Sequence, residues 1–167
     1  MARQSAGILL YRRGVERGAG VGGSALEVLL VHPGGPFWKN KDAGAWTIPK
    51  GEVGEGEDPR SCAVREFAEE LGTGLEAVAE GELRELPVVK QKGGKVVRAW
   101  ACRGNMEVGK VRSNTFRMEW PPRSGKFVEF PEVDRAAWFG IAEAREKINP
   151  AQSVWLEWAE RQAPNEP

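Results

Sequence analysis

The feature that most restricts the fold is a helix with two well-marked ends near the middle of the chain. Asp58 and Pro59 predict its first turn, because an aspartate side chain caps free backbone N–H groups and proline fits the first helical position. Gly72 stands where a left-handed C-terminal cap belongs. Between these ends, apolar residues recur every four positions: Ala63, Phe67 and Leu71. The chain must therefore supply an apolar surface on which this face of the helix can pack.

Short apolar runs on both sides of the helix predict that this surface is a β-sheet. The expected strands cover residues 6–11, 26–31, 46–49, 82–89, 95–102, 115–120 and 136–140. Helices are expected at 142–148 and 151–162. A glycine-rich loop at 14–24 would join the first two strands, and Gly93 and Gly94 would turn a long antiparallel hairpin. Because strands and helices are interspersed, the fold class is α/β (α+β) with a mixed sheet.

Composition indicates a single domain and excludes several classes of protein. With 167 residues, the chain is expected to form one domain over residues 1–162 and a loose tail at 163–167. Lysine plus arginine and aspartate plus glutamate each number 24, which argues against a nucleic-acid coat or a polybasic membrane binder. No apolar run approaches the roughly 20 residues that span a bilayer. Two isolated cysteines, Cys62 and Cys102, argue against a disulfide scaffold and favour the reducing cytoplasm.

The neutral total charge hides two blocks of opposite sign. Residues 51–72 contain seven acids and two bases, whereas residues 81–130 contain eleven bases and five acids. Such blocks indicate either a fold that forms ion pairs with itself or a site that holds a cation beside a polyanion. His32, the single histidine, lies outside both blocks in the segment 32–36 and is expected to close a turn there.

Four glutamates in the acidic block are spaced to hold a cation. Glu66, Glu69 and Glu70 stand at i, i+3 and i+4, so their carboxylates project from one helix face. Glu57 joins them at the start of the helix, where a glycine-rich turn folds back. Carboxylates that converge without cysteine or histidine nearby suit a hard divalent cation, Mg²⁺ or Mn²⁺. The alternative is an acidic helix face that is simply solvated.

The same segment resembles the signature of the Nudix hydrolase family. Gly51 is followed after five residues by Glu57, and after seven more by the sequence REFAEELG at 65–72, which matches every fixed position of the Nudix box. Thr73 is the one departure, because the family usually has an aliphatic residue there. The resemblance implies a Nudix-type α/β/α sandwich with a mixed sheet. It also implies a Mg²⁺-dependent hydrolase that cleaves a nucleoside diphosphate linked to another moiety, by attack of water on phosphorus.

The resemblance also implies roles for individual residues. It implies that the side chains of Glu66, Glu69 and Glu70 bind the metal. It implies the same for the backbone carbonyl of Lys50. Glu66 is in addition a candidate for orienting or deprotonating the attacking water. Glu57 and Arg65 would brace the loop against the helix. The metal would neutralise charge on the bridging and leaving oxygens and lower the pKa of bound water.

A further acid is expected in the segment before the last strand. The sequence PEVDRAAW at 131–138 is similar to the corresponding stretch of RNA pyrophosphohydrolases and plant-type dinucleoside tetraphosphate hydrolases. By that resemblance, Glu132 is the extra metal ligand or the general base. Glu129 is the alternative acid, and an ordinary surface ion pair is the alternative role for Glu132.

Several residues are candidates for binding the substrate. The sequence WTIPKG at 46–51 resembles the corresponding segment of diadenosine tetraphosphate hydrolases and diphosphoinositol polyphosphate phosphohydrolases, and Lys50 would pair with a phosphate. The predicted hairpin brings four cations close together: Lys90, Lys92, Lys95 and Arg98. Lys90, Lys92 and Arg98 are assigned to substrate binding. Lysines that protect a hairpin from aggregation would give the same pattern. Trp38, with Phe37 and Trp120, is a candidate platform for stacking a purine.

These features together predict an enzyme that acts on a small polyphosphate. A dinucleoside polyphosphate such as diadenosine tetraphosphate is the leading substrate, and an RNA 5′-triphosphate or a nucleoside triphosphate is the alternative. A Nudix-fold nucleotide sensor without turnover is the alternative of another class. The expected partner is a small nucleotide, with an RNA 5′ end less favoured and no membrane, and the protein is expected to be a monomer or homodimer.

Overall fold

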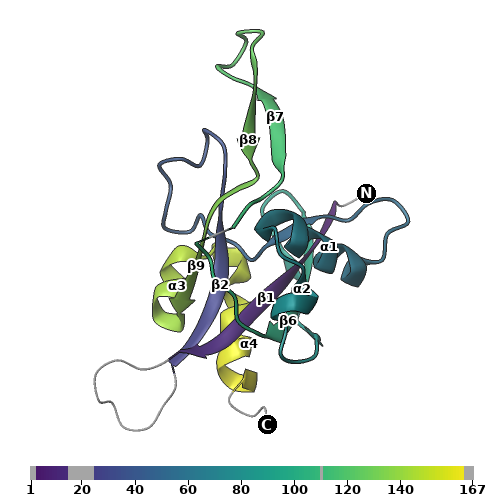
Figure 1. Cartoon of the computed structure of the whole chain (residues 1–167), viewed down its shortest axis with the longest axis vertical. Coiled ribbons are helices and arrows are strands. Elements are labelled where there is room, and N and C mark those ends of the chain that lie inside the picture. The colour runs from purple at the N-terminus through teal and green to yellow at the C-terminus, as the bar shows by residue number, and fades with distance from the viewer. Residues whose placement is uncertain (1–2, 15–24, 110, 164–167) are drawn as a thin grey trace.

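The computed structural model, which describes residues 3–14, 25–109 and 111–163, is built on one large sheet. Five strands of this seven-stranded sheet follow the order β4-β6-β1-β2-β9, of which Figure 1 labels the last four, while β3 pairs with β1 and β5 with β6. Its strands are β1 (Gln4–Gly14), β2 (Ala25–Pro33), β3 (Lys50–Glu52), β4 (Arg84–Glu85), β5 (Val89–Lys90), β6 (Val96–Arg103) and β9 (Val133–Gly140). Because β1 and β6 are parallel and the other pairs antiparallel, the predicted mixed sheet is confirmed.

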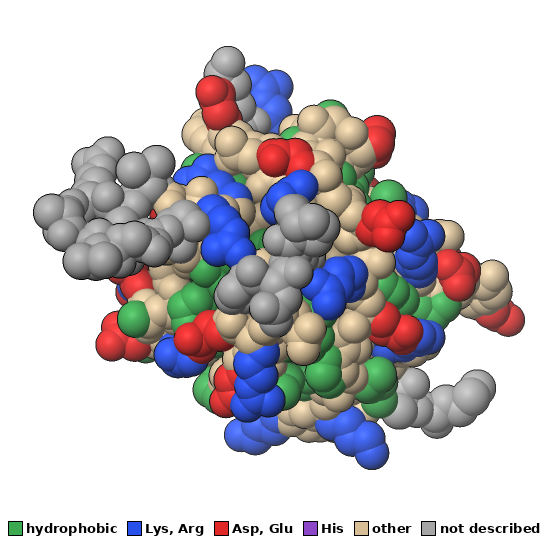
Figure 2. Space-filling model, turned by 90° about the horizontal axis from the view of Figure 1, so that it is seen from below, with side chains coloured by type: hydrophobic (Ala, Val, Ile, Leu, Met, Phe, Trp, Pro, Cys, Tyr) green, Lys and Arg blue, Asp and Glu red, His purple; other side chains and the backbone are tan. Residues whose placement is uncertain are grey.

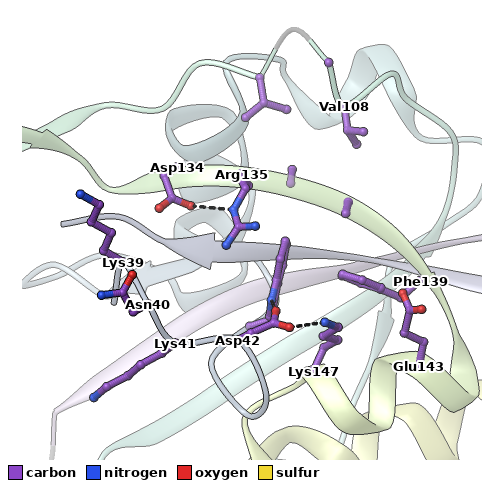
Figure 3. A pocket seen from close by; sticks show the side chains of 15 residues that line it. Lys39, Asn40, Lys41, Asp42, Val108, Asp134, Arg135, Phe139, Glu143 and Lys147 are labelled. Carbon is purple, nitrogen blue, oxygen red and sulfur yellow. Dashed lines mark hydrogen bonds and ion pairs between the residues drawn. The ribbon is translucent and has the colours of Figure 1, made fainter. Parts of the chain in front are cut away.

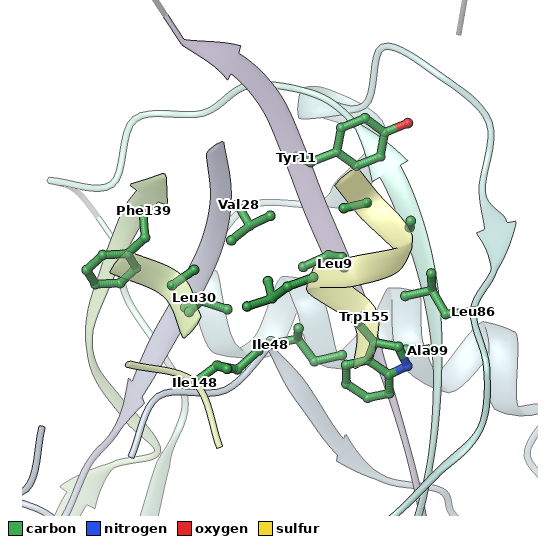
Figure 4. Packing of buried hydrophobic residues seen from close by; sticks show 14 of the residues in the cluster. Leu9, Tyr11, Val28, Leu30, Ile48, Leu86, Ala99, Phe139, Ile148 and Trp155 are labelled. Carbon is green, nitrogen blue, oxygen red and sulfur yellow. The ribbon is translucent and has the colours of Figure 1, made fainter. Parts of the chain in front are cut away.

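Helices cover both faces of the sheet, which gives the expected α/β/α sandwich (Figure 1). One face carries α1 (Pro59–Leu71) and α2 (Leu75–Val78), and the other carries α3 (Ile141–Lys147), the 3-10 helix η1 (Pro150–Gln152) and α4 (Ser153–Gln162). Alternation along β1 supplies both cores, because Leu9 packs on the α4 side and Ile8 on the α1 side. Figure 4 shows the α4 side, where Trp155 is completely buried.

Helix α1 has both of its predicted ends. The Asp58 carboxylate accepts a hydrogen bond from the Ser61 N–H at 3.0 Å, and Pro59 occupies the first turn. Gly72 adopts a left-handed conformation with a φ of 73°, and its N–H donates to the Ala68 carbonyl at 2.8 Å. The predicted apolar stripe is buried with residues of β1: Ala63, Phe67 and Leu71. Local signals therefore place this helix correctly against the sheet.

Residues 47–52, which precede α1, lie between the first half of β1 and the end of β2, so these two strands are not paired there. Thr47 forms an isolated bridge to Val31 of β2, whereas β3 pairs with the start of β1, with Lys50 opposite Gly7. β1 and β2 consequently pair with each other only from Tyr11 onward. This segment lies between the two strands, because the Ile8 N–H donates to the Pro49 carbonyl at 3.1 Å and the Val31 N–H donates to the Thr47 carbonyl at 2.8 Å. Lys50, the next residue, is joined to α1 by the hydrogen bond of its N–H to Glu70.

Two sequence expectations in this region are wrong in detail. The strand expected at 46–49 begins instead at Lys50, because Pro49 has no N–H to donate to a ladder. His32 does not close a turn: it is the completely buried penultimate residue of β2. Its Nδ1 lies 2.8 Å from the Asp134 carboxylate and its Nε2 lies 2.6 Å from the Lys41 carbonyl. The apolar run of β2 carries this histidine into the interior, where it joins β9 to the loop at 39–42.

The long hairpin predicted between 82 and 102 is present but interrupted. β4 and β5 both pair with β6 in the antiparallel sense, with Arg84 opposite Ala101 and Val89 opposite Val97. Residues 86–88 between these two short strands belong to neither. This segment contains Pro87, whose missing N–H explains the break in the ladder.

A second hairpin stands apart from the main sheet. It consists of β7 (Thr115–Glu119) and β8 (Phe127–Pro131), and it projects away from the sandwich (Figure 1). The strands expected from the sequence include β7 but not β8. The charged and proline-rich residues around 121–126, which directly precede β8, do not have the pattern of a strand. β8 leads directly into Glu132 and β9, so this hairpin is attached next to the predicted extra acid.

Ala163 is buried, and its carbonyl accepts a hydrogen bond from Arg13 at 2.8 Å, so the expected loose tail does not begin there. Residues 164–167 of that tail and most of the expected loop at 14–24 lie outside the described residues. Within the described ranges, no helix is long and apolar enough to cross a membrane. Acidic and basic side chains are interspersed at the end away from the projecting hairpin (Figure 2).

Candidate active site

Three carboxylates from two distant parts of the chain meet beside residues 47–52. Glu66 and Glu70 stand on α1, and Glu132 lies in the link between β8 and β9. One oxygen of each side chain lies within 4.8 Å of the others. Over the part of the chain that the structure describes, this is the one such group of potential metal ligands. Glu66 and Glu70 are each only 8% exposed, so their charges are poorly solvated.

The two helix acids are positioned by residues 47–52. A Cβ atom at Gly51 would lie 1.9 Å from the Glu66 Cδ, so only glycine leaves room for this carboxylate. The Lys50 N–H donates a hydrogen bond to Glu70 at 3.1 Å. Burial raises the pKa of both acids, and the charge of Glu69 raises the pKa of Glu66 further. A bound cation would compensate the negative charges that burial disfavours.

Glu132 is held beside these acids by backbone hydrogen bonds. Its N–H donates to the Asn114 carbonyl at 2.9 Å, and its own carbonyl accepts from the Gly34 N–H at 2.9 Å. The Asn114 N–H in turn donates to the Glu69 carbonyl at 2.8 Å, which ties this segment to α1. Burial, and then the charge of Glu69, raise the pKa of Glu132. The alternative acid, Glu129, is exposed on β8 and lies outside the cluster.

Arg65 binds the acids at the rim of the cluster. Its guanidinium donates two hydrogen bonds to Glu57, at 2.7 and 2.8 Å. It also donates to Glu66 at 3.0 Å and to Glu69 at 2.9 Å. Glu57 accepts the Gly54 N–H at 2.9 Å as well, so the turn and the helix are joined through one ion pair. This geometry supports the bracing role that the resemblance implies for Glu57 and Arg65.

The structure does not bring together the four glutamates that were expected to converge: Glu57, Glu66, Glu69 and Glu70. Arg65 pairs with Glu57 and Glu69 and also with Glu66, while Glu132 joins Glu66 and Glu70 in the cluster. The physical reason is that four like charges at one point repel, whereas a guanidinium can neutralise those at the rim. The role of Glu69 as a metal ligand stays a prediction.

The Glu57–Arg65 pair predicts a pH-dependent contribution to stability. Hydrogen bonds from the Arg65 guanidinium, and then from the Gly54 N–H, lower the pKa of Glu57 to about 2. An unfolded glutamate titrates at about 4.3, so the pair stabilises the fold above that pH and the stabilisation is lost as the pH falls toward 2. We expect Glu57→Gln to melt below the parent protein at about pH 7, with the difference shrinking below about pH 4. Thermal melts in EDTA check this, and a constant difference would contradict it.

A cleft of about 320 Å³ opens beside the carboxylate cluster. Glu70 and Glu132 line it together with two lysines, Lys50 and Lys95. Burial, and then the neighbouring ammonium of Lys95, lower the pKa of Lys50. Because two ammonium groups in a confined space repel each other, an anion placed between them would be stabilised. The cleft thus offers carboxylates for a cation beside lysines for a polyanion.

Only some of the predicted substrate-binding residues line this cleft. Lys50 and Trp38 do, and the remaining three do not: Lys90, Lys92 and Arg98. The first two of these are exposed, while the guanidinium of Arg98 pairs with Glu85 at 2.8 Å. Lys95, the residue just before β6, is the hairpin cation that reaches the cleft. Sequence spacing grouped the four cations but could not show which of them would face the acids.

Three polar residues of the site have no signal in the sequence. Gln91 and Asn149 line the cleft. The completely buried Gln152 accepts the Ile48 N–H at 3.1 Å and donates to the Gln91 side chain at 2.9 Å. These partners are 104 and 61 residues away in sequence, so no local pattern could reveal them. Gln152 holds Gln91 at the cleft and supports the segment that leads to Lys50.

A larger cavity, of about 650 Å³, lies along the outer edge of β9 (Figure 3). Several of its charged side chains are paired with each other, Lys147 with Asp42 and Arg135 with Asp134 at 3.6 Å. None of the three clustered carboxylates lines it. We therefore place the candidate active site in the smaller cleft, where Glu70 and Glu132 meet Lys50 and Lys95.

The chain is similar to one family model and to a curated relative. The NUDIX domain model matches residues 1–159. The bis(5′-nucleosyl)-tetraphosphatase (asymmetrical) of Rattus norvegicus is 36% identical over 104 residues. The match covers 60% of this chain and 64% of the rat protein, so the chain spans somewhat less than two thirds of that relative.

Solved structures share the fold at low sequence identity. A crystal structure of a C. elegans Ap4A hydrolase binary complex has a TM-score of 0.65 and 21% identity, and the match covers 96% of this chain and 98% of that chain. The NUDIX domain of Shewanella oneidensis NrtR, complexed with ADP ribose, has a TM-score of 0.60 and 15% identity, covering 99% and 90% of the two chains. At these identities the likeness is one of fold.

Proposed function

Because the chain belongs to the Nudix family, we propose that it is a divalent-metal-dependent hydrolase of phosphoanhydride bonds whose substrate is a dinucleoside polyphosphate such as diadenosine tetraphosphate. One observation carries this proposal: the clustered carboxylates of Glu66, Glu70 and Glu132 adjoin a cleft that also contains Lys50 and Lys95. Acids that bind a metal and cations that bind a phosphate chain are the two requirements for attack of water on phosphorus.

The donor set fits a hard divalent cation such as Mg²⁺ or Mn²⁺. The three clustered side chains offer only carboxylate oxygens, and these lie within 4.8 Å of one another. Hard cations prefer such oxygen ligands. Glu66, Glu70 and Glu132 would hold the ion, with Glu69 and the Lys50 carbonyl as further candidate ligands. When bound, the ion would neutralise charge on phosphate oxygens and lower the pKa of the attacking water.

The protein's own side chains would orient the substrate and accept a proton. The ammonium groups of Lys50 and Lys95 would bind non-bridging phosphate oxygens as point charges. Glu66 and Glu132 are the candidates for accepting the proton of the water, because their carboxylates belong to the cluster that would hold the metal and its bound water. Arg65 would keep Glu66 oriented through its hydrogen bond of 3.0 Å.

The choice among phosphoanhydrides is supported by the rat relative, whose name describes a bis(5′-nucleosyl) tetraphosphate as its substrate. RNA 5′-triphosphate ends and nucleoside triphosphates contain the same bond and are the alternatives. A nucleotide sensor without turnover is the alternative of another class. The buried acids of the cluster argue against a sensor, because binding alone does not require charges that are costly to bury.

Turnover with and without metal tests the proposal. We expect the protein to hydrolyse diadenosine tetraphosphate in Mg²⁺ and to lose at least ~10²-fold of that activity in excess EDTA, because the metal contributes several kcal/mol of charge stabilisation. Mass spectrometry of products formed in ¹⁸O-labelled water shows which phosphorus the water attacks. Parallel reactions with an RNA 5′-triphosphate and a nucleoside triphosphate rank the alternatives. Nucleotide binding without turnover on any of these compounds would support the sensor instead.

A further inference from the structure

The projecting β7–β8 hairpin has one apolar face. In its register, Phe116 lies opposite Phe130 and Met118 lies opposite Val128, and directly opposed residues point to the same side of a sheet. The two phenylalanine rings are 6.0 Å apart between centroids. The opposite face is mainly charged: Arg117, Glu119 and Glu129, with Phe127. The hairpin therefore has distinct apolar and polar sides although it projects from the protein.

The apolar face is turned toward the loop at 33–38. Gly35 has a φ of 96°, and a Cβ atom there would lie 2.9 Å from the Phe116 ring, so the loop backbone packs directly on the hairpin. Further along the loop, Phe37 packs edge-to-face on Trp120, with centroids 5.6 Å apart and ring planes at 83°. Loop and hairpin thus meet through Phe37 and Trp120 and through the contact of Gly35 with Phe116. Together with Trp38, the next residue of the loop, these side chains form what we call the aromatic platform: Phe37, Trp38, Phe116 and Trp120.

The aromatic platform is incompletely covered. Phe37 is 59% exposed, Trp38 is 39% exposed, and the neighbouring Val128 on the apolar face is 40% exposed. A two-stranded hairpin alone is at most marginally stable in water. Exposed apolar side chains gathered at one place are typical of a binding surface. A flat partner that covered these rings would stabilise the platform by removing them from water.

The aromatic platform adjoins, through Trp38, the cleft that Lys50 and Lys95 line. Trp38 lines that cleft together with Glu132. Glu132 directly follows β8, and its carbonyl accepts the N–H of Gly34 in the loop. Hairpin, loop and carboxylate cluster therefore share one backbone junction. A nucleotide with phosphates at Lys50 and Lys95 would have the aromatic platform next to its nucleoside.

We propose that the aromatic platform binds the heterocyclic base of the nucleotide whose phosphates lie in the cleft. This inference rests on the proposed function and adds the part of the substrate that the metal site does not contact. Aromatic rings suit a planar base, because bases stack on aromatic side chains whatever their hydrogen-bonding pattern. The platform therefore contributes affinity for nucleosides as a class and leaves the identity of the base open.

A comparison of two ligands isolates the contribution of the base. ATP and inorganic tripolyphosphate both carry three phosphates, but only ATP carries a nucleoside. Calorimetry with both ligands in Mg²⁺ would use the Glu70→Gln variant as background, because its expected slow turnover keeps ATP intact. In that background we expect Phe37→Ala and Trp120→Ala to weaken ATP binding roughly 5–150-fold and to leave tripolyphosphate binding unchanged.

Two matched variants serve as controls for this experiment. Phe127→Ala removes a phenylalanine that is 54% exposed on the opposite face of the same hairpin, and we expect it to change neither affinity. Lys95→Ala removes a cation of the cleft, and we expect it to weaken both ligands by the same factor. The aromatic variants and the lysine variant thus have different signatures if base and phosphates occupy adjoining sites.

Three results would overturn the base site. They are an unchanged ATP affinity in both aromatic variants, an equal loss for the two ligands, and a loss of self-association in Phe37→Ala without any change in ATP affinity. The last would assign the platform to contact between copies of the chain. Turnover of the parent protein distinguishes this failure from failure of the proposed function. ATP selectivity without any hydrolysis retains the base site, whereas hydrolysis with unaffected aromatic variants retains only the enzyme.

Discussion

Glu70→Gln is expected to lower kcat for diadenosine tetraphosphate by at least ~10²-fold without unfolding the protein. Glutamine keeps an oxygen that can accept the Lys50 N–H but cannot supply the negative charge that a bound cation would draw from Glu70. Because burial raises the pKa of Glu70, its ionised form is disfavoured in the folded protein, and a neutral amide does not weaken the fold. Activity should therefore fall while Tm stays at or above that of the parent.

Steady-state kinetics and thermal melting of the same preparation separate these two effects. Glu55→Gln is the matched control, because Glu55 belongs to the same acidic turn but is exposed and lies outside the cluster. We expect Glu55→Gln to retain the parent kcat. A parent-like kcat in Glu70→Gln would show that the cluster is not the catalytic centre.

Phe67→Ala is expected to lower the free energy of unfolding by about 3–5 kcal/mol. Phe67 is completely buried between α1 and the sheet, in the same core as Ile8 and Leu10. Its loss would leave a cavity under the helix that carries Glu66 and Glu70. For a chain of this size, the change corresponds to a fall in Tm of roughly 6–20 °C.

Denaturant titration measures this loss, and Val154→Ala is the control. Val154 is a helix residue that is 38% exposed on α4, and its truncation should change the unfolding free energy by no more than about 0.5 kcal/mol. Activity of Phe67→Ala should return toward the parent value at low temperature, where the folded fraction is high. Parent-like stability of this variant would mean that α1 is not anchored through its apolar stripe.

Helix α1 was predictable in full because its determinants lie within a short segment. Asp58, Pro59 and Gly72 act on backbone groups no more than four residues away, and the stripe follows the helical period. The carboxylates of Glu66 and Glu70 were predictable for the same reason, since their spacing puts them on one face. Strand bounds were less predictable, because proline and pairing partners decide them, as at Pro49 and Pro87.

The extra acid shows where local reasoning ends. Residue type and resemblance indicated Glu132, but only the packing of the β8–β9 link on Asn114 and Gly34 puts it next to α1. The same holds for Lys95 among the hairpin cations, and for Gln152. His32 shows the reverse error, because turn-forming neighbours suggested a loop where the strand continues into the core.

By itself, the sequence determined a mixed α/β fold class, its central capped helix and the acidic character of one face of that helix. These properties depend on periodicity and on capping, which act between residues close together in the chain. Only the tertiary structure decided which acids meet, which lysine joins them and where the aromatic hairpin stands. Those arrangements depend on contacts between segments tens of residues apart, whose relative positions are set by packing on the shared sheet rather than by any local pattern.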